Sequence, residues 1–268
     1  MTTCTTCPYC GVGCGVIASA DGMIKGDPNH PANFGLLCSK GSALGETIGL
    51  DGRLLKPRIH GSDVAWDTAL DLVASQFSKA IAEHGPDSVA FYVSGQLLTE
   101  DYYVANKLMK GYIGSANIDT NSRLCMASSV AGHKRAFGSD TVPGSYEDLE
   151  DADLLVLVGS NLAWCHPVLH QRVMAAKAAR PNMRIINIDP RRTASSEVAD
   201  MHLGVAPDGD VALFNGLLAY LAKTDKIDFD YVNQHVEGFA EALSAAQATN
   251  PSDSGLNDFD LAQIYRAW

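Results

Sequence analysis

The chain has 268 residues, of which 46% are apolar and 19% are charged, and this composition excludes an intrinsically disordered protein. Its 20 basic and 31 acidic residues give a formal net charge of −11, which argues against general binding to nucleic-acid phosphates. No apolar run approaches the roughly 20 residues that a membrane-spanning helix needs. At about 150 residues per domain, the length predicts two domains.

The first 57 residues are expected to form a separate small module. Five of the seven cysteines lie within the first 38 residues, and this clustering favours a metal site over a disulfide framework. The pair Asp21-Gly22 predicts a hairpin turn between short strands over Val16–Ser19 and Met23–Lys25. Because such a module is too small for a hydrophobic core of its own, its ligands are expected to hold it together.

From Trp66 onward, helical and strand patterns alternate, which predicts an α/β fold with a Rossmann-like parallel sheet. The region 58–268 is divided into a first part (58–150), a dinucleotide-binding part (151–225) and the start of a further region (226–268), with no clear element before the final residue. Predicted helices run from Trp66 to the stop at Gly85-Pro86 and over Asp101–Ile113, Met126–Phe137, Pro167–Ala179, Asp210–Lys223 and Tyr231–Ala246, and predicted strands cover Val89–Val93, Leu154–Val158 and Arg184–Ile188.

The amino-terminal cysteines can be grouped in two ways. Cys4, Cys7, Cys10 and Cys14 have the C-x2-C-x2-C-x3-C spacing of a bacterial ferredoxin run. The last cysteine of such a run ligates a second cluster, for which this chain has no second set of cysteines. The other grouping omits Cys4 and takes Cys38 as the fourth ligand after a gap of 23 residues (38 − 14 − 1). Cys4 is then a spare thiol near a flexible end.

The second grouping supplies the four thiolates that a single iron–sulfur cubane requires. Gly11, Gly13 and Gly15 would let the backbone wrap a bulky cluster. Structural zinc is the alternative, but zinc sites usually use two C-x2-C-like pairs. Three clustered cysteines with one distant partner therefore favour the iron–sulfur cluster.

Several further motifs resemble the amino-terminal part of the molybdopterin oxidoreductases of the dimethyl-sulfoxide-reductase superfamily. The resemblance covers nearly the whole chain, and the combination of motifs is specific although each alone is weak. The motifs are Cys7-Pro8-Tyr9-Cys10-Gly11-Val12-Gly13-Cys14, Cys38-Ser39-Lys40-Gly41, Gly95-Gln96, Asn121-Ser122-Arg123-Leu124-Cys125-Met126, Val158-Gly159-Ser160-Asn161, Asp189-Pro190-Arg191-Arg192-Thr193 and Pro207-Asp208-Gly209-Asp210.

The resemblance implies two redox groups, a [4Fe–4S] cluster and a molybdenum ion held by two molybdopterin guanine dinucleotides. Cys125 matches the position whose side chain ligates the molybdenum, and a helix start would favour its thiolate. Lys40 matches a lysine on the electron path between the cluster and the pterin. The implied cluster ligands are Cys7, Cys10, Cys14 and Cys38.

The resemblance and the strand ends together suggest residues that contact the pterin dinucleotides. Gln96 and Asn121 are carried over as pterin contacts. Backbone N–H groups after a strand can cradle a pyrophosphate, and Arg side chains can meet its charge. Asp208 and Asp210 would suit a ribose or a guanine edge, although Asp210 could instead cap a helix. The other expected contacts at strand ends are Gly159, Ser160, Asn161, Asp189, Arg191 and Arg192.

Within the family, the chain is most similar to assimilatory and periplasmic nitrate reductases. Formate dehydrogenases typically have His after the metal-ligating Cys or selenocysteine, and here Met126 follows Cys125. Periplasmic members carry a twin-arginine signal, and none precedes Cys4, so a cytoplasmic location is expected. The implied reaction is reduction of nitrate to nitrite, with ferredoxin, flavodoxin or a NADH-linked subunit as electron donor. Formate oxidation remains the enzyme alternative.

Family members are several times longer, so the chain is expected to be an amino-terminal fragment with an incomplete fold and no activity of its own. An iron–sulfur electron-transfer module without catalysis is the non-enzyme alternative. His166 and His170 stand four residues apart, but they lack an acidic third ligand and are not expected to bind metal. Cys165 is expected to lie near the cofactor without ligating it.

Overall fold

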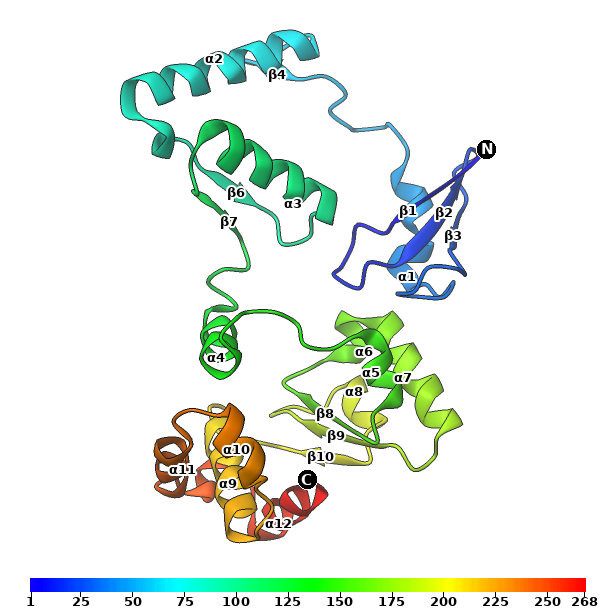
Figure 1. The fold of residues 1–268 in the computed structure, drawn as a ribbon. Helices are drawn as coiled ribbons and strands as arrows, with labels where there is room; N and C mark the ends of the chain where they lie inside the picture. The colour runs from blue at the N-terminus through cyan, green and yellow to red at the C-terminus, as the bar shows by residue number, and fades with distance from the viewer. The chain divides into compact units, whose positions relative to one another are not determined.

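The computed structural model describes all 268 residues, which form two compact units, Met1–Ser145 and Tyr146–Trp268. Figure 1 shows the elements of each unit. None of the helices is both long and apolar enough to cross a membrane.

The first unit begins with an antiparallel sheet in the order β1-β2-β3, made of Thr2–Thr6, Gly15–Ser19 and Ile24–Gly26. The predicted hairpin forms, but its turn has three residues, Ala20 to Gly22, and not the expected two. The Ser19 N–H donates to the Met23 carbonyl at 2.9 Å, and Gly22 has a φ of +85°. Strand β1 was not predicted. It places Cys4 opposite Ile17 in a ladder, so the expected flexible end is wrong. Helix α1 (Ser39–Ser42) and the 3₁₀ turn η1 (Leu44–Thr47) complete the module.

The rest of the first unit contains two pairs of short strands and the helices that connect and follow them. Strands β4 (Arg58–Ile59) and β5 (Ser62–Asp63) precede α2 (Trp66–His84), which ends where Gly85 and Pro86 predict, and then comes η2 (Pro86–Ser88). Strands β6 (Phe91–Val93) and β7 (Ile118–Thr120) pair in parallel. They are connected by α3 (Thr99–Asn106) and the π-helix η3 (Lys107–Ile113), and α4 (Ala127–Phe137) follows them.

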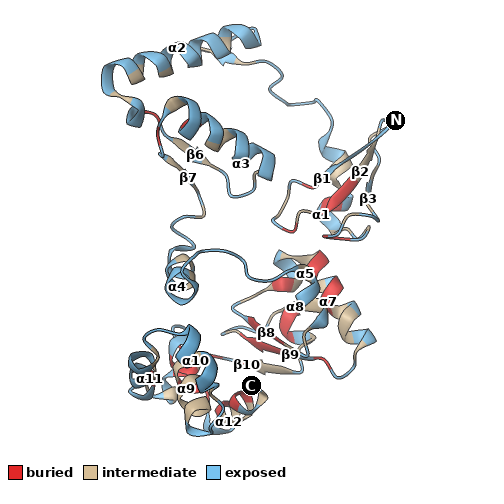
Figure 2. Cartoon of the chain, in the orientation of Figure 1, coloured by how far each residue is buried: buried red, intermediate tan, exposed pale blue.

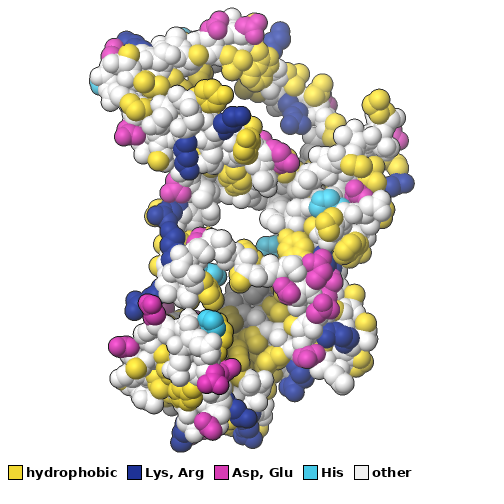
Figure 3. All heavy atoms as spheres, in the orientation of Figure 1, with side chains coloured by type: hydrophobic (Ala, Val, Ile, Leu, Met, Phe, Trp, Pro, Cys, Tyr) yellow, Lys and Arg dark blue, Asp and Glu magenta, His cyan; other side chains and the backbone are white.

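Two predictions for this region need correction. The buried strand over Val89–Val93 is shorter, and Tyr92 at its centre is exposed, because an apolar run does not reveal whether a second layer covers it. The single helix over Asp101–Ile113 begins earlier and changes to π hydrogen bonding at Lys107. Apolar side chains of α2, including Leu70 and Val73, are exposed, and hydrophobic side chains appear at its surface in Figure 3.

The second unit is built on a parallel sheet in the order β10-β9-β8, which confirms the predicted α/β fold. Strands β8 (Leu154–Val158) and β9 (Arg184–Ile188) pair in register from Leu154 with Arg184, and β10 (Met201–Leu203) pairs with the other edge of β9. Ile185 through Ile188 are all buried, as expected for a central strand covered on both faces.

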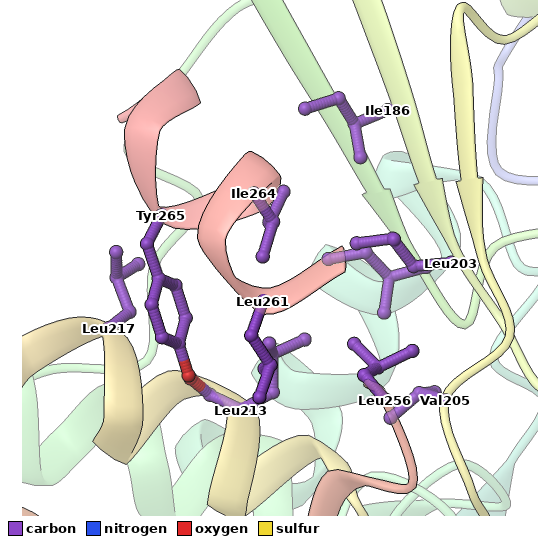
Figure 4. Close-up of a cluster of buried hydrophobic side chains, with 10 residues drawn as sticks. Ile186, Leu203, Val205, Leu213, Leu217, Leu256, Leu261, Ile264 and Tyr265 are labelled. Carbon is purple, nitrogen blue, oxygen red and sulfur yellow. The ribbon is translucent and has the colours of Figure 1, made fainter. Parts of the chain in front are cut away.

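Helices cover both faces of this sheet, with α7 on one side and α9 and α12 on the other in Figure 1. Buried residues concentrate in the strands and the covering helices (Figure 2), and Figure 4 shows Leu213 of α9 and Ile264 of α12 in one cluster with Ile186 and Leu203. The helices are α5 (Tyr146–Asp151), α6 (Leu162–Cys165), α7 (Pro167–Ala179), α8 (Ala194–Glu197), α9 (Asp210–Lys223), α10 (Phe229–His235), α11 (Phe239–Gln247), η4 (Pro251–Ser254) and α12 (Asp258–Ala267).

The carboxyl-terminal predictions were partly wrong. The helix expected over Tyr231–Ala246 is two helices, because Gly238 adopts a left-handed conformation with a φ of +72° between them. The end of the chain does carry an element, α12. Asn257 caps it by accepting a hydrogen bond from the Asp260 N–H at 2.9 Å, a signal that was present in the sequence.

Candidate functional site: a four-cysteine loop and the ends of parallel strands

The loop from Cys7 to Cys14 is closed by its own backbone. The Cys7 N–H donates to the Cys14 carbonyl at 2.8 Å, so the two ends of the loop lie side by side. Gly13 has a φ of +70°, which favours glycine. Gly15 is required for a different reason, since a Cβ there would lie 2.3 Å from the His30 ring.

Asn33 connects this loop to the segment that carries the fourth cysteine, and sequence reasoning missed it. Its side chain is fully buried and makes three hydrogen bonds. Its Oδ1 accepts from the Gly15 N–H at 2.8 Å, and its Nδ2 donates to the carbonyls of Gly15 at 3.0 Å and Leu36 at 2.8 Å. Gly15 follows Cys14 and Leu36 lies two residues before Cys38, so Asn33 fixes the two ligand segments against each other.

Cys7 and Cys14 lie close enough to the other two predicted cluster thiols for these to affect their pKa values. Burial raises the pKa of the Cys14 thiol to about 11, and the neighbouring thiols of Cys10, Cys7 and Cys38 add to the rise. Burial likewise raises the pKa of Cys7, opposed by a backbone hydrogen bond at Tyr9. Because a raised pKa keeps a thiol protonated near neutral pH, a metal cluster bound here would have to displace the protons of Cys7 and Cys14.

No three His, Cys, Asp or Glu side chains form a group that could hold a single metal ion. Cys4 is exposed on β1 and does not contribute to the pKa shifts of Cys7 or Cys14.

Lys40 lies in α1, directly after the Cys38 segment. Its side chain is exposed, and its positive charge lowers the pKa of Cys7, although burial has the larger, opposite effect. The structure therefore places this ammonium beside the cysteine loop, where it would favour a more negative, reduced cluster.

Gln96 and Asn121 are brought together by the loop that follows β6. The Asn121 Oδ1 accepts from the Gly95 N–H at 2.7 Å, and the Gln96 Nε2 donates to the Tyr9 carbonyl at 2.5 Å. Residues of this loop and of the cysteine loop line one cavity of about 320 Å³, including Cys7, Cys10 and Gln96. Gln96 thus contacts the cysteine loop, a partner that the sequence did not indicate.

Cys125 is an exposed free thiol two residues before the first residue of α4. Met126 is the N-cap, so Cys125 precedes the helix and does not form its first turn. An exposed thiol near a helix amino terminus is available to a metal and experiences a favourable dipole.

In the second unit, the predicted dinucleotide contacts follow the carboxyl ends of neighbouring parallel strands. Gly159 follows β8 with a φ of +57°, and its N–H donates to the Ile188 carbonyl at 2.9 Å. Asn161, Arg191 and Arg192 line a common cavity of about 380 Å³. Such crevices are where open parallel sheets bind ligands, and the two guanidinium groups suit phosphate.

Two residues that the sequence analysis missed shape this cavity. The buried Ser195 Oγ accepts from the Ala163 N–H at 2.9 Å and stands 3.4 Å from the Asn161 Oδ1. Trp164 contributes an exposed aromatic face to the lining. The Thr193 hydroxyl accepts from the Ser195 N–H at 3.2 Å and caps α8.

The predicted acidic residues have different roles. The Asp189 Oδ1 accepts from the Arg191 N–H at 2.8 Å and shapes the loop after β9. Asp208 is exposed with a φ of +65°. Asp210 is the first residue of α9, and Gly209 is the N-cap, so the capping alternative for Asp210 is wrong. Neither Asp208 nor Asp210 lines the 380 Å³ cavity.

His166 is the N-cap of α7 and His170 lies within that helix; that the pair binds no metal stays a prediction. Burial lowers the pKa of His170. Cys165, at the end of α6, is exposed.

A module with four clustered cysteines and, in the second unit, a parallel sheet with a crevice at its carboxyl ends are features of a cofactor-binding protein. Residues 1–49 match the molybdopterin oxidoreductase Fe4S4 domain, and residues 53–242 match molybdopterin oxidoreductase. The chain belongs to the molybdopterin oxidoreductase family.

Nitrate reductases are among its similar relatives. The chain is 60% identical to the nitrate reductase of Klebsiella oxytoca over 85% of its own length and 27% of the relative's. It is 49% identical to the Shewanella frigidimarina nitrate reductase over 98% of its own length and 30% of the relative's. It is 43% identical to the periplasmic nitrate reductase of Desulfovibrio desulfuricans over 88% of its own length and 32% of the relative's. The chain thus spans about a third of the length of these relatives.

A solved structure shares the fold. Acetylene hydratase from Pelobacter acetylenicus matches with a TM-score of 0.81 at 24% identity, over 98% of this chain and 38% of that one. The match includes residues of both units and shows a shared fold, which by itself does not define a chemistry.

Proposed function

We propose that this chain is the amino-terminal part of a molybdenum-dependent nitrate reductase. The observation that carries the proposal is the set of four interacting thiols, Cys7, Cys10, Cys14 and Cys38, in a chain 60% identical to a nitrate reductase over most of its length. The reaction takes nitrate, two electrons and two protons to nitrite and water.

The residues of the chain fit the two redox groups of the proposal. The four thiols would hold a [4Fe–4S] cluster, and Cys125 would ligate molybdenum in a bis(molybdopterin guanine dinucleotide) cofactor. When bound, these groups supply one-electron transfer and the two-electron reduction of the substrate. Lys40 keeps a positive charge beside the cysteine loop and thereby favours electron uptake there.

The strand-end loops of the second unit would hold a dinucleotide. Arg191 and Arg192 offer charge-assisted hydrogen bonds to phosphate, and Asn161, held near the Ser195 hydroxyl, offers an amide to a base or ribose. Gly159 and Ser160 leave room for close approach after β8. Asp189, Asp208 and Asp210 complete the proposed contacts; Asp208 lies in the loop before α9, and Asp210 is the first residue of that helix.

Nitrate is proposed over formate because Met126, and not His, follows Cys125. The assimilatory role, the cytoplasmic location and an electron donor of the ferredoxin, flavodoxin or NADH-linked kind stay predictions. One of the similar relatives is named a periplasmic nitrate reductase. Cell fractionation with an antibody against the chain would test the cytoplasmic location.

The decisive experiment uses the full-length protein that contains this chain. Purified protein is analysed for iron and molybdenum and is assayed with reduced methyl viologen and nitrate, and separately with formate and an oxidised dye. Nitrite formation with both metals bound supports the proposal. Formate oxidation without nitrite formation contradicts it, and iron without molybdenum favours an electron-transfer module.

A further inference from the structure

The Gln96 side chain makes a hydrogen bond across 87 residues of sequence to the backbone of the cysteine loop. Its Nε2 donates to the Tyr9 carbonyl at 2.5 Å, and Tyr9 lies between the predicted ligands Cys7 and Cys10. Gln96 also lines the 320 Å³ cavity together with those two cysteines. The side chain therefore contacts the part of the loop that carries two of the four thiols.

The loop that presents Gln96 is itself held on both sides. The Gly95 N–H donates to the Asn121 Oδ1 at 2.7 Å, and the Gln96 N–H donates to the Ser94 Oγ at 3.1 Å. The Tyr102 hydroxyl donates to the Ser94 carbonyl at 2.6 Å. Asn121 lies four residues before Cys125, so one hydrogen-bonded connection runs from the cysteine loop to the segment leading to the proposed molybdenum ligand.

The hydrogen bond that the Tyr9 carbonyl accepts from Gln96 affects the N–H group of Cys10. The Tyr9 carbonyl and the Cys10 N–H belong to one peptide group, and a donor at the oxygen strengthens the N–H as a donor because hydrogen bonds in a chain polarise one another. Hydrogen bonds and local charge are two of the factors that set the reduction potential of an iron–sulfur cluster. A change in the hydrogen-bond donor or the charge at position 96 is therefore expected to alter the reduction potential of a cluster bound by this loop.

We propose that Gln96 is a positioning residue for the cysteine loop and that its hydrogen bond to Tyr9 helps to set the reduction potential of the cluster bound there. The inference rests on the proposed [4Fe–4S] site. It gives Gln96 a role beside the pterin contact that the family resemblance implies.

Three substitutions of similar length separate positioning from packing. Gln96→Met removes the donor, Gln96→Lys keeps a donor and adds a positive charge, and Gln96→Glu removes the donor and adds a negative charge. The 268-residue chain is reconstituted anaerobically with iron and sulfide, and the midpoint potential is measured by redox titration with electron paramagnetic resonance detection. We expect the potential to fall in the order Lys, wild type, Met, Glu.

A second readout needs no cluster. In the chain without iron, hydrogen–deuterium exchange in the Cys7–Cys14 loop should be faster for Gln96→Met than for the wild type, and Gln96→Lys should restore slow exchange. Gln234→Met, at an exposed position of α10, is the matched control and should change neither measurement.

The outcomes distinguish this inference from the proposed function. If the wild-type chain takes up no iron–sulfur cluster, the cluster assignment fails and the potential argument fails with it. If the wild type binds a cluster and all three variants share its potential and exchange rates, only the role of Gln96 is overturned. Equal shifts in all three variants would also overturn it, because packing alone would explain them.

Discussion

Replacing Asn33 by Ala tests the idea that one buried amide holds the cysteine module together. The substitution removes three hydrogen bonds and leaves the buried Gly15 N–H without its side-chain acceptor. The Gly15 carbonyl keeps a second donor, the Asp27 N–H at 3.0 Å, so its loss is smaller. At about 1 kcal/mol for each hydrogen bond, the module should lose ~3 kcal/mol of stability.

The assay is hydrogen–deuterium exchange of residues 14–36 in the chain without iron. At 1.36 kcal/mol for each tenfold change, the predicted loss corresponds to an opening equilibrium roughly 150-fold larger. Asn29→Ala is the matched control, because Asn29 lies in the same loop with an exposed side chain. Exchange in Asn33→Ala that stays within threefold of the Asn29→Ala rate would refute the reasoning.

Three further predictions follow from the site and from the second unit. In the full-length protein, Cys125→Ala should abolish molybdenum-dependent nitrite formation while the cluster signal persists; unchanged activity would remove the metal-ligand role. Burial lowers the pKa of His170, and burial and the charge of Arg192 lower the pKa of His202. As the pH falls, these two histidines therefore become protonated in the unfolded chain before they do in the folded chain. Unit stability should therefore be complete above pH 6.5 and decline as the pH falls below it, and His202→Gln should flatten this slope in urea titrations at several pH values. Arg172 is buried, and its Nε lies 2.5 Å from the Glu150 Oε1. Glu150→Ala should lower the free energy of unfolding by about 2–4 kcal/mol in urea titrations, because it leaves a buried charge without this partner, and Arg172→Met should lower it less. The reverse order would contradict a buried-charge penalty.

Local patterns were sufficient to predict the central helix and two of the three strands of the second unit. The helix over Pro167–Ala179 and the strands over Leu154–Val158 and Arg184–Ile188 agree with the structure at both ends. Each has a continuous apolar signal and a clear stop, so local chemistry and tertiary packing favour the same conformation.

The missed features depend on contacts between distant residues. Strand β1 has a polar Thr-rich sequence, and its pairing with β2 cannot be read from its own pattern. Asn33 looks like an ordinary loop residue until the backbone places it beside Gly15. The link from Gln96 to Tyr9 spans 87 residues, and only the folded loop brings the two together.

The proposed dinucleotide contacts of the second unit are carried by loops, whereas the strands beneath them are occupied with packing. The side chains of Ile186, Ile188 and Leu203 pack in the core with residues of α9 and α12. Exposed loop residues such as Arg191 and Arg192 can therefore be exchanged at little risk to folding, because they lie outside the core. Contacts to the proposed dinucleotide can be altered there while the strands are left intact.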